Sequence, residues 1–169
     1  MSDRTLFDPE HLIRSGGDIV RTSPLSVFSG LSDLLANTDG TVHWELSASR
    51  DAHQRLLLIL QLNAQLELKC QRCLGPLGHV LNETRRFALY KDEASLPELD
   101  EEEDDLDCLV ATGEMDALAL VEEELLLALP MMPLHETESC HASIEAEEEE
   151  GELELKPSPF AMLSRLRNS

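Results

Sequence analysis

Residues 56–70 read Leu-Leu-Leu-Ile-Leu-Gln-Leu-Asn-Ala-Gln-Leu-Glu-Leu-Lys-Cys, and this stretch decides the fold. Every second side chain is apolar, and the intervening side chains become polar after Ile59. A period of two is typical of a β-strand with one buried face and one open face. Fifteen residues at about 3.3 Å each would span roughly 50 Å, which is too long for a small sheet. We therefore expect a bend or bulge near Asn63 that divides the strand into two pairing segments. The predicted buried face consists of Leu56, Leu58, Leu60, Leu62, Ala64, Leu66, Leu68 and Cys70.

The segments on either side of this strand extend the sheet. Apolar and polar side chains also alternate over residues 41–48, and a further strand is predicted over residues 79–90. Short turns join these successive strands, so the sheet should be antiparallel. We therefore predict an α+β protein in which a curved antiparallel meander, able to curl toward a barrel, packs with a few helices.

Helical signals precede and follow the predicted sheet. A short helix is expected over residues 9–14, and a second should begin at Ser23-Pro24, where Ser is an N-cap and Pro suits the first turn. The strongest helix is expected to follow Asp116 and to end before Pro130, with Glu122, Glu123 and Glu124 on its solvated side. Its predicted apolar positions are Leu118, Val121, Leu125, Leu126 and Leu129.

These patterns divide the chain into three parts that we treat as one domain with a tail. Residues 1–40 form a predicted helical N-terminal region. Residues 41–140 hold the antiparallel sheet, a Cys-x-x-Cys turn and the covering helix. Residues 141–169 are predicted to form an acidic linker and a short amphipathic C-terminal helix that begins at Ser158-Pro159.

Charge is unevenly distributed along the 169 residues, which carry a formal net charge of −21. Residues 92–107 contain ten acidic side chains and residues 136–154 contain nine, and such runs repel themselves and stay solvated. Residues 50–91 instead hold seven basic and only three acidic side chains. The runs are interpreted either as aids to solubility or as a shield for a basic partner such as a ribosomal protein.

Targeting signals are not evident in the sequence. The sequence contains no stretch of about 18 apolar residues, so no membrane span is predicted. Charged residues interrupt the first twenty positions, so no secretory segment is predicted and we expect a cytoplasmic protein. In a reducing compartment, four cysteines are more often thiols or metal ligands than disulfides.

Cys70-Gln71-Arg72-Cys73 is the one compact motif that could carry chemistry. Two thiolates in such a turn can bind one Zn²⁺, which prefers four soft or borderline ligands in a tetrahedron. His135 and Cys140 are the best candidates for the other two ligands, with His141 and His79 as alternatives and Cys108 as a bystander. Four free thiols in a metal-free fold are an equally good interpretation, and a redox dithiol is a weaker one.

Enzyme signatures are absent from the sequence. It contains no Gly-rich phosphate loop, no nucleophile elbow and no His-Glu-x-x-His motif. A binding or assembly protein without a small-molecule substrate is therefore the better class.

Several motifs together resemble one family. Residues 68–74, Leu-Lys-Cys-Gln-Arg-Cys-Leu, look like the Cys-x-Arg-Cys-Leu signature of the YceD family, the large ribosomal RNA subunit accumulation proteins. The resemblance continues through the Leu- and Glu-rich residues 116–130, through Pro-Met-Met-Pro-Leu-His at 130–135 with Cys140, and into Pro-Ser-Pro-Phe at 157–160. Some members of the family continue past the second cluster into Cys-Pro-x-Cys-Gly, whereas here His141-Ala142-Ser143 follows Cys140.

The resemblance implies a non-enzymatic factor that supports synthesis, processing or stability of 23S rRNA. We expect it to bind rRNA or a pre-50S particle through cations of the sheet. The alternative is an acidic chaperone or adaptor for a basic ribosomal protein, without direct RNA contact. Neighbouring residues of a strand point to opposite faces, so these cations cannot all form one patch. The candidate RNA-binding residues are Arg50, Arg55, Lys69, Arg72, Arg85, Arg86 and Lys91.

Overall fold

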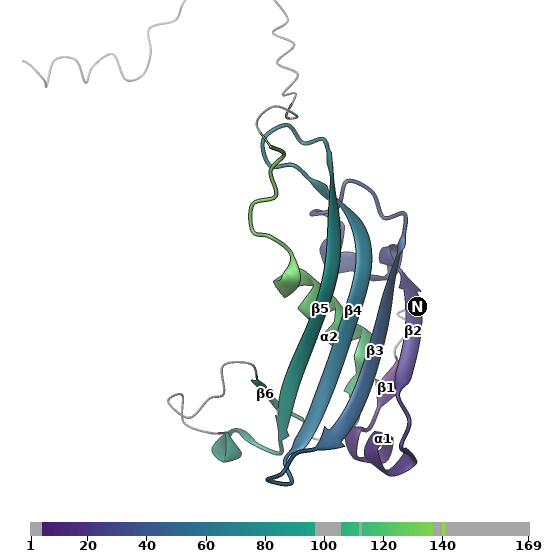
Figure 1. Ribbon diagram of the computed structural model, residues 1–169, viewed down its shortest axis with the longest axis vertical. Coiled ribbons are helices and arrows are strands. Elements are labelled where there is room, and N and C mark those ends of the chain that lie inside the picture. The colour runs from purple at the N-terminus through teal and green to yellow at the C-terminus, as the bar shows by residue number, and fades with distance from the viewer. Residues whose placement is uncertain (1–4, 97–105, 112, 137–139, 141–169) are drawn as a thin grey trace, which may run out of the picture.

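A long, curved sheet of five strands is the main element of the computed structural model, which describes residues 5–96, 106–111, 113–136 and 140 (Figure 1). The strand order is β2-β3-β4-β5-β6. Strands β3 to β5 form the predicted antiparallel meander. Two strands that were not predicted extend it, because β2 pairs with β3 antiparallel and β6 pairs with β5 in parallel. The predicted α+β class is confirmed, and the sheet is open rather than closed into a barrel. The strands are β2 (Ile19–Pro24), β3 (Thr41–Arg50), β4 (Leu56–Lys69), β5 (Pro76–Tyr90) and β6 (Asp107–Val110).

The predicted bulge near Asn63 is wrong. Strand β4 pairs with β5 in one continuous register, from Leu56 opposite Leu89 to Lys69 opposite Pro76. Strand β5 is 15 residues long and β4 is 14 residues long, so β5 offers a partner to every residue of β4. The two strands accommodate their length by curving together, as Figure 1 shows.

The first predicted helix is confirmed as α1 (Pro9–Ser15). The Asp8 side chain caps its first turn by accepting hydrogen bonds from the backbone N–H groups of Glu10 and His11. Gly16 ends the helix with φ of 62°, a left-handed conformation that glycine adopts without strain. Beside α1, the short strands β1 (Leu6–Phe7) and β7 (Met115–Asp116) form a separate antiparallel pair that ties the N-terminal segment to the start of α2.

The helix predicted at Ser23-Pro24 is wrong, so the N-terminal region is only partly helical. Ser23 and Pro24 end β2, and two 3₁₀ turns follow, η1 (Leu25–Val27) and η2 (Ser29–Leu31). Leu25, Phe28 and Leu31 are spaced three residues apart, which fits the period of a 3₁₀ turn as well as that of an α-helix. A third 3₁₀ turn, η3 (Glu93–Ser95), follows β5.

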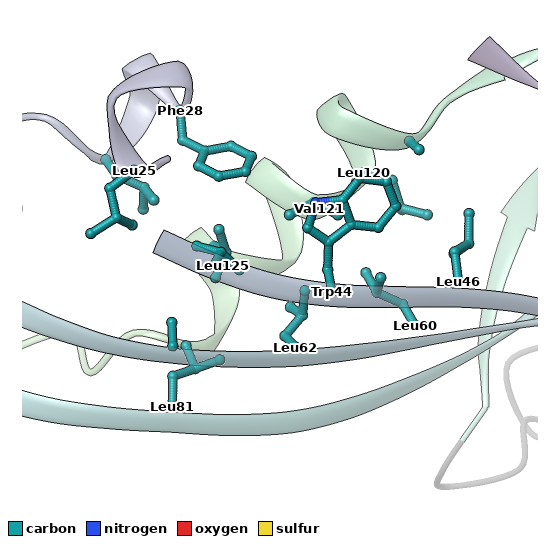
Figure 2. Packing of buried hydrophobic residues seen from close by; sticks show 14 of the residues in the cluster. Leu25, Phe28, Trp44, Leu46, Leu60, Leu62, Leu81, Leu120, Val121 and Leu125 are labelled. Carbon is teal, nitrogen blue, oxygen red and sulfur yellow. The ribbon is translucent and has the colours of Figure 1, made fainter. Parts of the chain in front are cut away.

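Helix α2 (Ala117–Ala128) covers one face of the sheet, and the main hydrophobic core lies between them. Asp116 is its N-cap, as predicted, and accepts a hydrogen bond from the N–H of Leu118. Figure 2 shows the Trp44 indole reaching from β3 toward Val121 and Leu120 of α2. The alternating residues of β4 from Leu58 to Leu68 fill this core as the sequence predicted, whereas Leu56 is only half-buried. A smaller cluster on the other face joins Leu57, Ala88 and Leu106.

The predicted solvated side of α2 is only partly solvated. Glu123 is exposed, but the carboxylate of Glu122 accepts a hydrogen bond from the N–H of Gly30 at 2.6 Å. Glu124 is buried with only 5% of its surface exposed, and it lies 3.5 Å from Nε of Arg85. The position at which α2 begins turns Glu124 toward the sheet, where the guanidinium of Arg85 on β5 lies beside it. Among the described residues, no helix has the length and apolar character needed to cross a membrane.

Candidate metal centre and basic cleft

The Cys-x-x-Cys motif forms the tight turn between β4 and β5. The N–H of Cys70 donates to the carbonyl of Gly75 at 2.9 Å, and the N–H of Leu74 donates to the carbonyl of Cys70 at 2.8 Å. Leu74 has φ of 59°, a left-handed conformation that reverses the chain. Because Cys70 ends the buried face of β4, its side chain is fully buried, while that of Cys73 is half-buried. Both thiols are therefore held on the inner side of the turn.

The segment after α2 packs onto this turn. Pro133 is buried, and its carbonyl accepts a hydrogen bond from the N–H of Gln71 at 2.9 Å. The N–H of His135 then points at Sγ of Cys70, at 3.5 Å. Two segments 65 residues apart in the chain are thus joined by backbone contacts, which places His135 and Cys140 beside the two turn cysteines.

The four candidate ligand atoms converge on one point. Those of Cys70, Cys73, His135 and Cys140 all lie within 4.8 Å of one another. The Cys70 and Cys140 sulfurs are 3.9 Å apart, and Nδ1 of His135 lies 3.3 Å from Sγ of Cys73. Two sulfurs bound to one tetrahedral Zn²⁺ at about 2.3 Å each would be roughly 3.8 Å apart. The donor set and its spacing therefore fit a Cys₃His zinc site.

The His135 ring is oriented for such a role. Its Nε2 lies 2.9 Å from the carbonyl oxygen of Pro76, which can only accept a hydrogen bond. Nε2 therefore carries the proton, and the lone pair of Nδ1 faces the sulfur cluster. A histidine that binds a metal through one nitrogen usually donates its other N–H to a carbonyl in this way. A Cβ at Gly75 would sit 3.4 Å from Sγ of Cys73, so glycine lets the backbone pass close to the cluster.

The surroundings favour a thiolate at Cys70. Burial alone would raise the pKa of this thiol, but the backbone N–H groups of His135, Cys73 and Arg72 outweigh it and lower the pKa to about 5. Burial raises the pKa of Cys140, and its hydrogen bonds to Cys73 and Cys70 raise it further. One thiol of the cluster is thus prepared to act as an anion, the form in which sulfur binds metals.

The other candidate ligands lie elsewhere or outside the described residues. His79 is on β5 and does not belong to the cluster. Cys108 is on β6, opposite Ala88 at the far end of β5, in keeping with its predicted role as a bystander. His141 falls outside the described residues. Sequence analysis missed the carbonyls of Pro76 and Pro133, because a sequence does not reveal which backbone groups face a distant segment.

The seven candidate RNA-binding cations do not form one surface. Lys69 and Arg72 lie at the Cys-x-x-Cys end of the sheet, where Nζ of Lys69 donates to the carbonyl of Asp33 at 3.2 Å. Arg85 lies 3.5 Å from the carboxylate of Glu124 on α2 and 3.9 Å from that of Glu83, a residue of its own strand β5. Arg86 is exposed and pairs with Ile59, so it points to the opposite face. Four of the seven cations thus lie at different places on the sheet and do not share one surface.

The remaining three cations, Arg50, Arg55 and Lys91, line one cleft at the opposite end of the sheet. Its volume is about 670 Å³. The strand register explains the convergence, because Arg50 lies opposite Leu56 on β4 and Leu56 lies opposite Leu89 on β5. We call this site the basic cleft. The other lining residues are Asp8, Pro9, Glu10, Gln54, Leu56, Leu89, Tyr90, Asp92, Ser95, Ala111 and Gly113.

Two of the three cations of the basic cleft have internal partners. The guanidinium of Arg55 lies 2.6 Å from the Asp51 carboxylate. Burial would raise the pKa of Asp51, but the hydrogen bonds and charge of Arg55 lower it below its ordinary value. Nη1 of Arg50 donates to the carbonyl of Gln54 at 3.0 Å, while Lys91 forms no ion pair within the described part of the chain.

The molecule is thus an open α+β sheet with a Cys₃His cluster at one end and a basic cleft at the other. Comparison with known proteins gives the family. Residues 58–167 match the family described as Large ribosomal RNA subunit accumulation protein YceD, and the chain belongs to this family. A curated relative of that name from Haemophilus influenzae is 31% identical over 144 residues, which cover 81% of this chain and 80% of the relative. None of the solved structures matches the chain.

Proposed function

We propose that this protein is a non-enzymatic, cytoplasmic factor that supports synthesis, processing or stability of 23S rRNA by binding rRNA or a pre-50S particle. Membership of a family named for accumulation of the large ribosomal RNA subunit supports the role. The observation that carries direct contact is the convergence of Arg50, Arg55 and Lys91 from separate segments on one cleft. Lysine and arginine contacts to phosphates supply most of the affinity of proteins for nucleic acid.

Co-sedimentation with large-subunit precursors tests this function. The double variant Arg50→Glu/Lys91→Glu should lose association, and binding of the wild-type protein should weaken steeply as salt is raised. The double variant Arg14→Glu/Arg21→Glu is the matched control, because it makes the same change in charge at exposed positions outside the cleft. Equal co-sedimentation of all three proteins would contradict contact through the basic cleft.

The alternative, an acidic chaperone or adaptor for a basic ribosomal protein, also has an observation in its favour. The described residues carry nine basic and eighteen acidic side chains, and both Arg55 and Arg85 face carboxylates. Affinity capture with and without ribonuclease separates the two functions. Partners that survive ribonuclease treatment and are basic ribosomal proteins would favour the alternative, whereas loss of all partners would favour RNA contact.

We also propose that Cys70, Cys73, His135 and Cys140 hold a structural Zn²⁺. A closed set of four protein ligands leaves no open position for a substrate, so the ion would act as a cross-link rather than a catalyst. When bound, it would join the β4–β5 turn to the segment after α2 and stabilise both. Free thiols in a metal-free fold are the competing interpretation.

Native mass spectrometry with and without a chelator tests the zinc proposal. The protein should carry one zinc ion, and Cys73→Ser should lose it while Cys108→Ser retains it. A protein purified without added chelator that binds no zinc, before or after incubation with the metal, would contradict the proposal.

A further inference from the structure

The basic cleft has a lining that is not simply cationic. Three carboxylates, those of Asp8, Glu10 and Asp92, stand beside Arg50, Arg55 and Lys91. Two of the carboxylates are engaged locally, because Asp8 caps α1 and Asp92 accepts a hydrogen bond from Oγ of Ser95 at 2.6 Å. A bare anion would be attracted by one set of charges and repelled by the other. The occupant should therefore offer more than a negative charge.

Apolar surface supplies the third property of the cleft. Leu56 and Leu89 are half-buried neighbours on β4 and β5, and both line the cleft. Unpaired bases of RNA stack on aromatic and apolar surfaces and offer N–H donors on their edges. A nucleotide has a phosphate for the cations, a flat base for the apolar side chains and N–H groups for the carboxylates. It matches all three properties at once.

The size of the cleft suits an unpaired nucleotide better than a duplex. A volume of about 670 Å³ lies within the range of sites that enclose one small ligand. A double helix presents its bases inside a stack and offers mainly phosphates and groove edges to a protein surface. Only a nucleotide that is free of its partner can place both its base and its phosphate inside such a cleft.

We propose that the basic cleft binds one unpaired nucleotide of RNA, with its phosphate between Arg50 and Lys91 and its base against Leu56 and Leu89. This inference rests on the proposed function and names the feature of the RNA that is bound. Lys91 should contribute most to binding of the phosphate, because it is exposed and forms no ion pair within the described residues. Arg50 is already oriented by its hydrogen bond to Gln54.

Fluorescence anisotropy with the full-length protein tests the inference. The probes are a short unstructured RNA oligonucleotide, a fully paired RNA hairpin of equal length, and the mononucleotides AMP and GMP. The unstructured RNA should bind most tightly, and Arg50→Glu and Lys91→Glu should each weaken its binding by about tenfold or more, because each replaces an attractive charge by a repulsive one. Lys91→Gln should have a smaller effect, and unchanged circular dichroism should show that the variants fold.

Arg21→Glu is the matched control, since Arg21 is exposed on β2, does not line the cleft and undergoes the same change in charge. It should change affinity by less than about twofold, because salt screens distant charges. Equal weakening by Arg21→Glu would contradict the basic cleft as the binding site. Equal affinity for the hairpin would contradict an unpaired nucleotide as the ligand. Equal affinity for a mononucleotide would overturn RNA as the source.

The outcome is separable from that of the proposed function. If the wild-type protein binds none of these probes but still co-sediments with large-subunit precursors, the nucleotide site is wrong while the proposed function stands. If it binds unstructured RNA through the cleft but does not associate with precursors, the nucleotide site stands and the role at the large subunit fails.

Discussion

The two ends of the β4–β5 pair hold different kinds of site. At the turn end, three sulfurs and one imidazole nitrogen lie within 4.8 Å of one another, and backbone hydrogen bonds define their positions. At the other end, charged side chains from the β3–β4 turn, the end of β5 and the start of α1 surround a cleft of about 670 Å³. The cluster depends on direct contact between ligand atoms, whereas the cleft acts through the electrostatic attraction and repulsion of its charged side chains. A single sheet therefore places the proposed structural site and the proposed recognition site at opposite ends.

The largest effect should come from the core that both ends share. Trp44→Ala removes a side chain that is 1% exposed and should lower the free energy of unfolding by about 3–5 kcal/mol. Chemical denaturation measures this loss, and hydrogen exchange should show faster opening at both ends of β4. Ser49→Ala changes an exposed position of β3, the strand that carries Trp44, and should change stability by less than about 0.5 kcal/mol. Opening at one end alone would show that the ends do not share a scaffold.

Removal of zinc should separate the two ends. With free zinc at a hundred times its dissociation constant, chelation should lower the free energy of unfolding by about 2.7 kcal/mol. Hydrogen exchange should accelerate at residues 70–76 and 131–136 and stay unchanged around the basic cleft. Cys73→Ser should reproduce the effect without chelator, and Cys108→Ser should not. A chelator effect that is equally large in Cys73→Ser would contradict the assignment of the ligands.

The pH dependence of stability should reveal the buried Glu124 between the two ends. Burial is the largest cause that raises its pKa above the ordinary 4.5, with Asp107 and Glu123 adding to it and Arg85 opposing it. The folded state then holds a proton that the unfolded state has released, so the contribution of Glu124 to stability should fall as the pH rises from about 4.5 through the raised pKa. The lowered pKa of Cys70 acts in the opposite direction, so the contribution of Glu124 is read from the difference between the wild type and a variant that cannot ionise there.

The variant Glu124→Gln should remove this dependence, because the amide keeps an acceptor for Arg85 but cannot ionise. Its stability near neutral pH should differ from that of the wild type by no more than about 1 kcal/mol. Thermal unfolding as a function of pH gives the measurement. Glu123→Gln, the exposed neighbour on α2, is the control and should keep the wild-type profile. If the wild type instead gains stability relative to Glu124→Gln as the pH rises over this range, Arg85 outweighs burial.

The smallest effect should be that of Lys91→Glu on stability. Lys91 is exposed and forms no ion pair within the described residues, so its replacement should change the free energy of unfolding by less than about 0.5 kcal/mol. Thermal unfolding checks this expectation. A loss of several degrees in Tm would mean that the cation supports the fold rather than recognition, and would weaken the contrast between the two ends.

The sequence alone was sufficient for the local features. The period of two over residues 56–70 predicted the central strand and its buried face, because burial of alternate side chains depends only on backbone geometry. The N-cap at Asp116 and the left-handed stop at Gly16 are also local. The Cys-x-x-Cys turn could be recognised for the same reason. Where more than one local structure fits the spacing, as at Leu25 to Leu31, the prediction failed.

Only the tertiary structure decided which distant residues meet. Nothing in the spacing places His135 beside Cys73, and the contact depends on α2 crossing the sheet and on Pro133 pairing with Gln71. Strand register likewise brings Arg50, Leu56 and Leu89 side by side, while Glu124 removes Arg85 from any cationic surface. These outcomes follow from the packing of whole elements, whose relative positions are set by the shared core and are not encoded in any single stretch of residues.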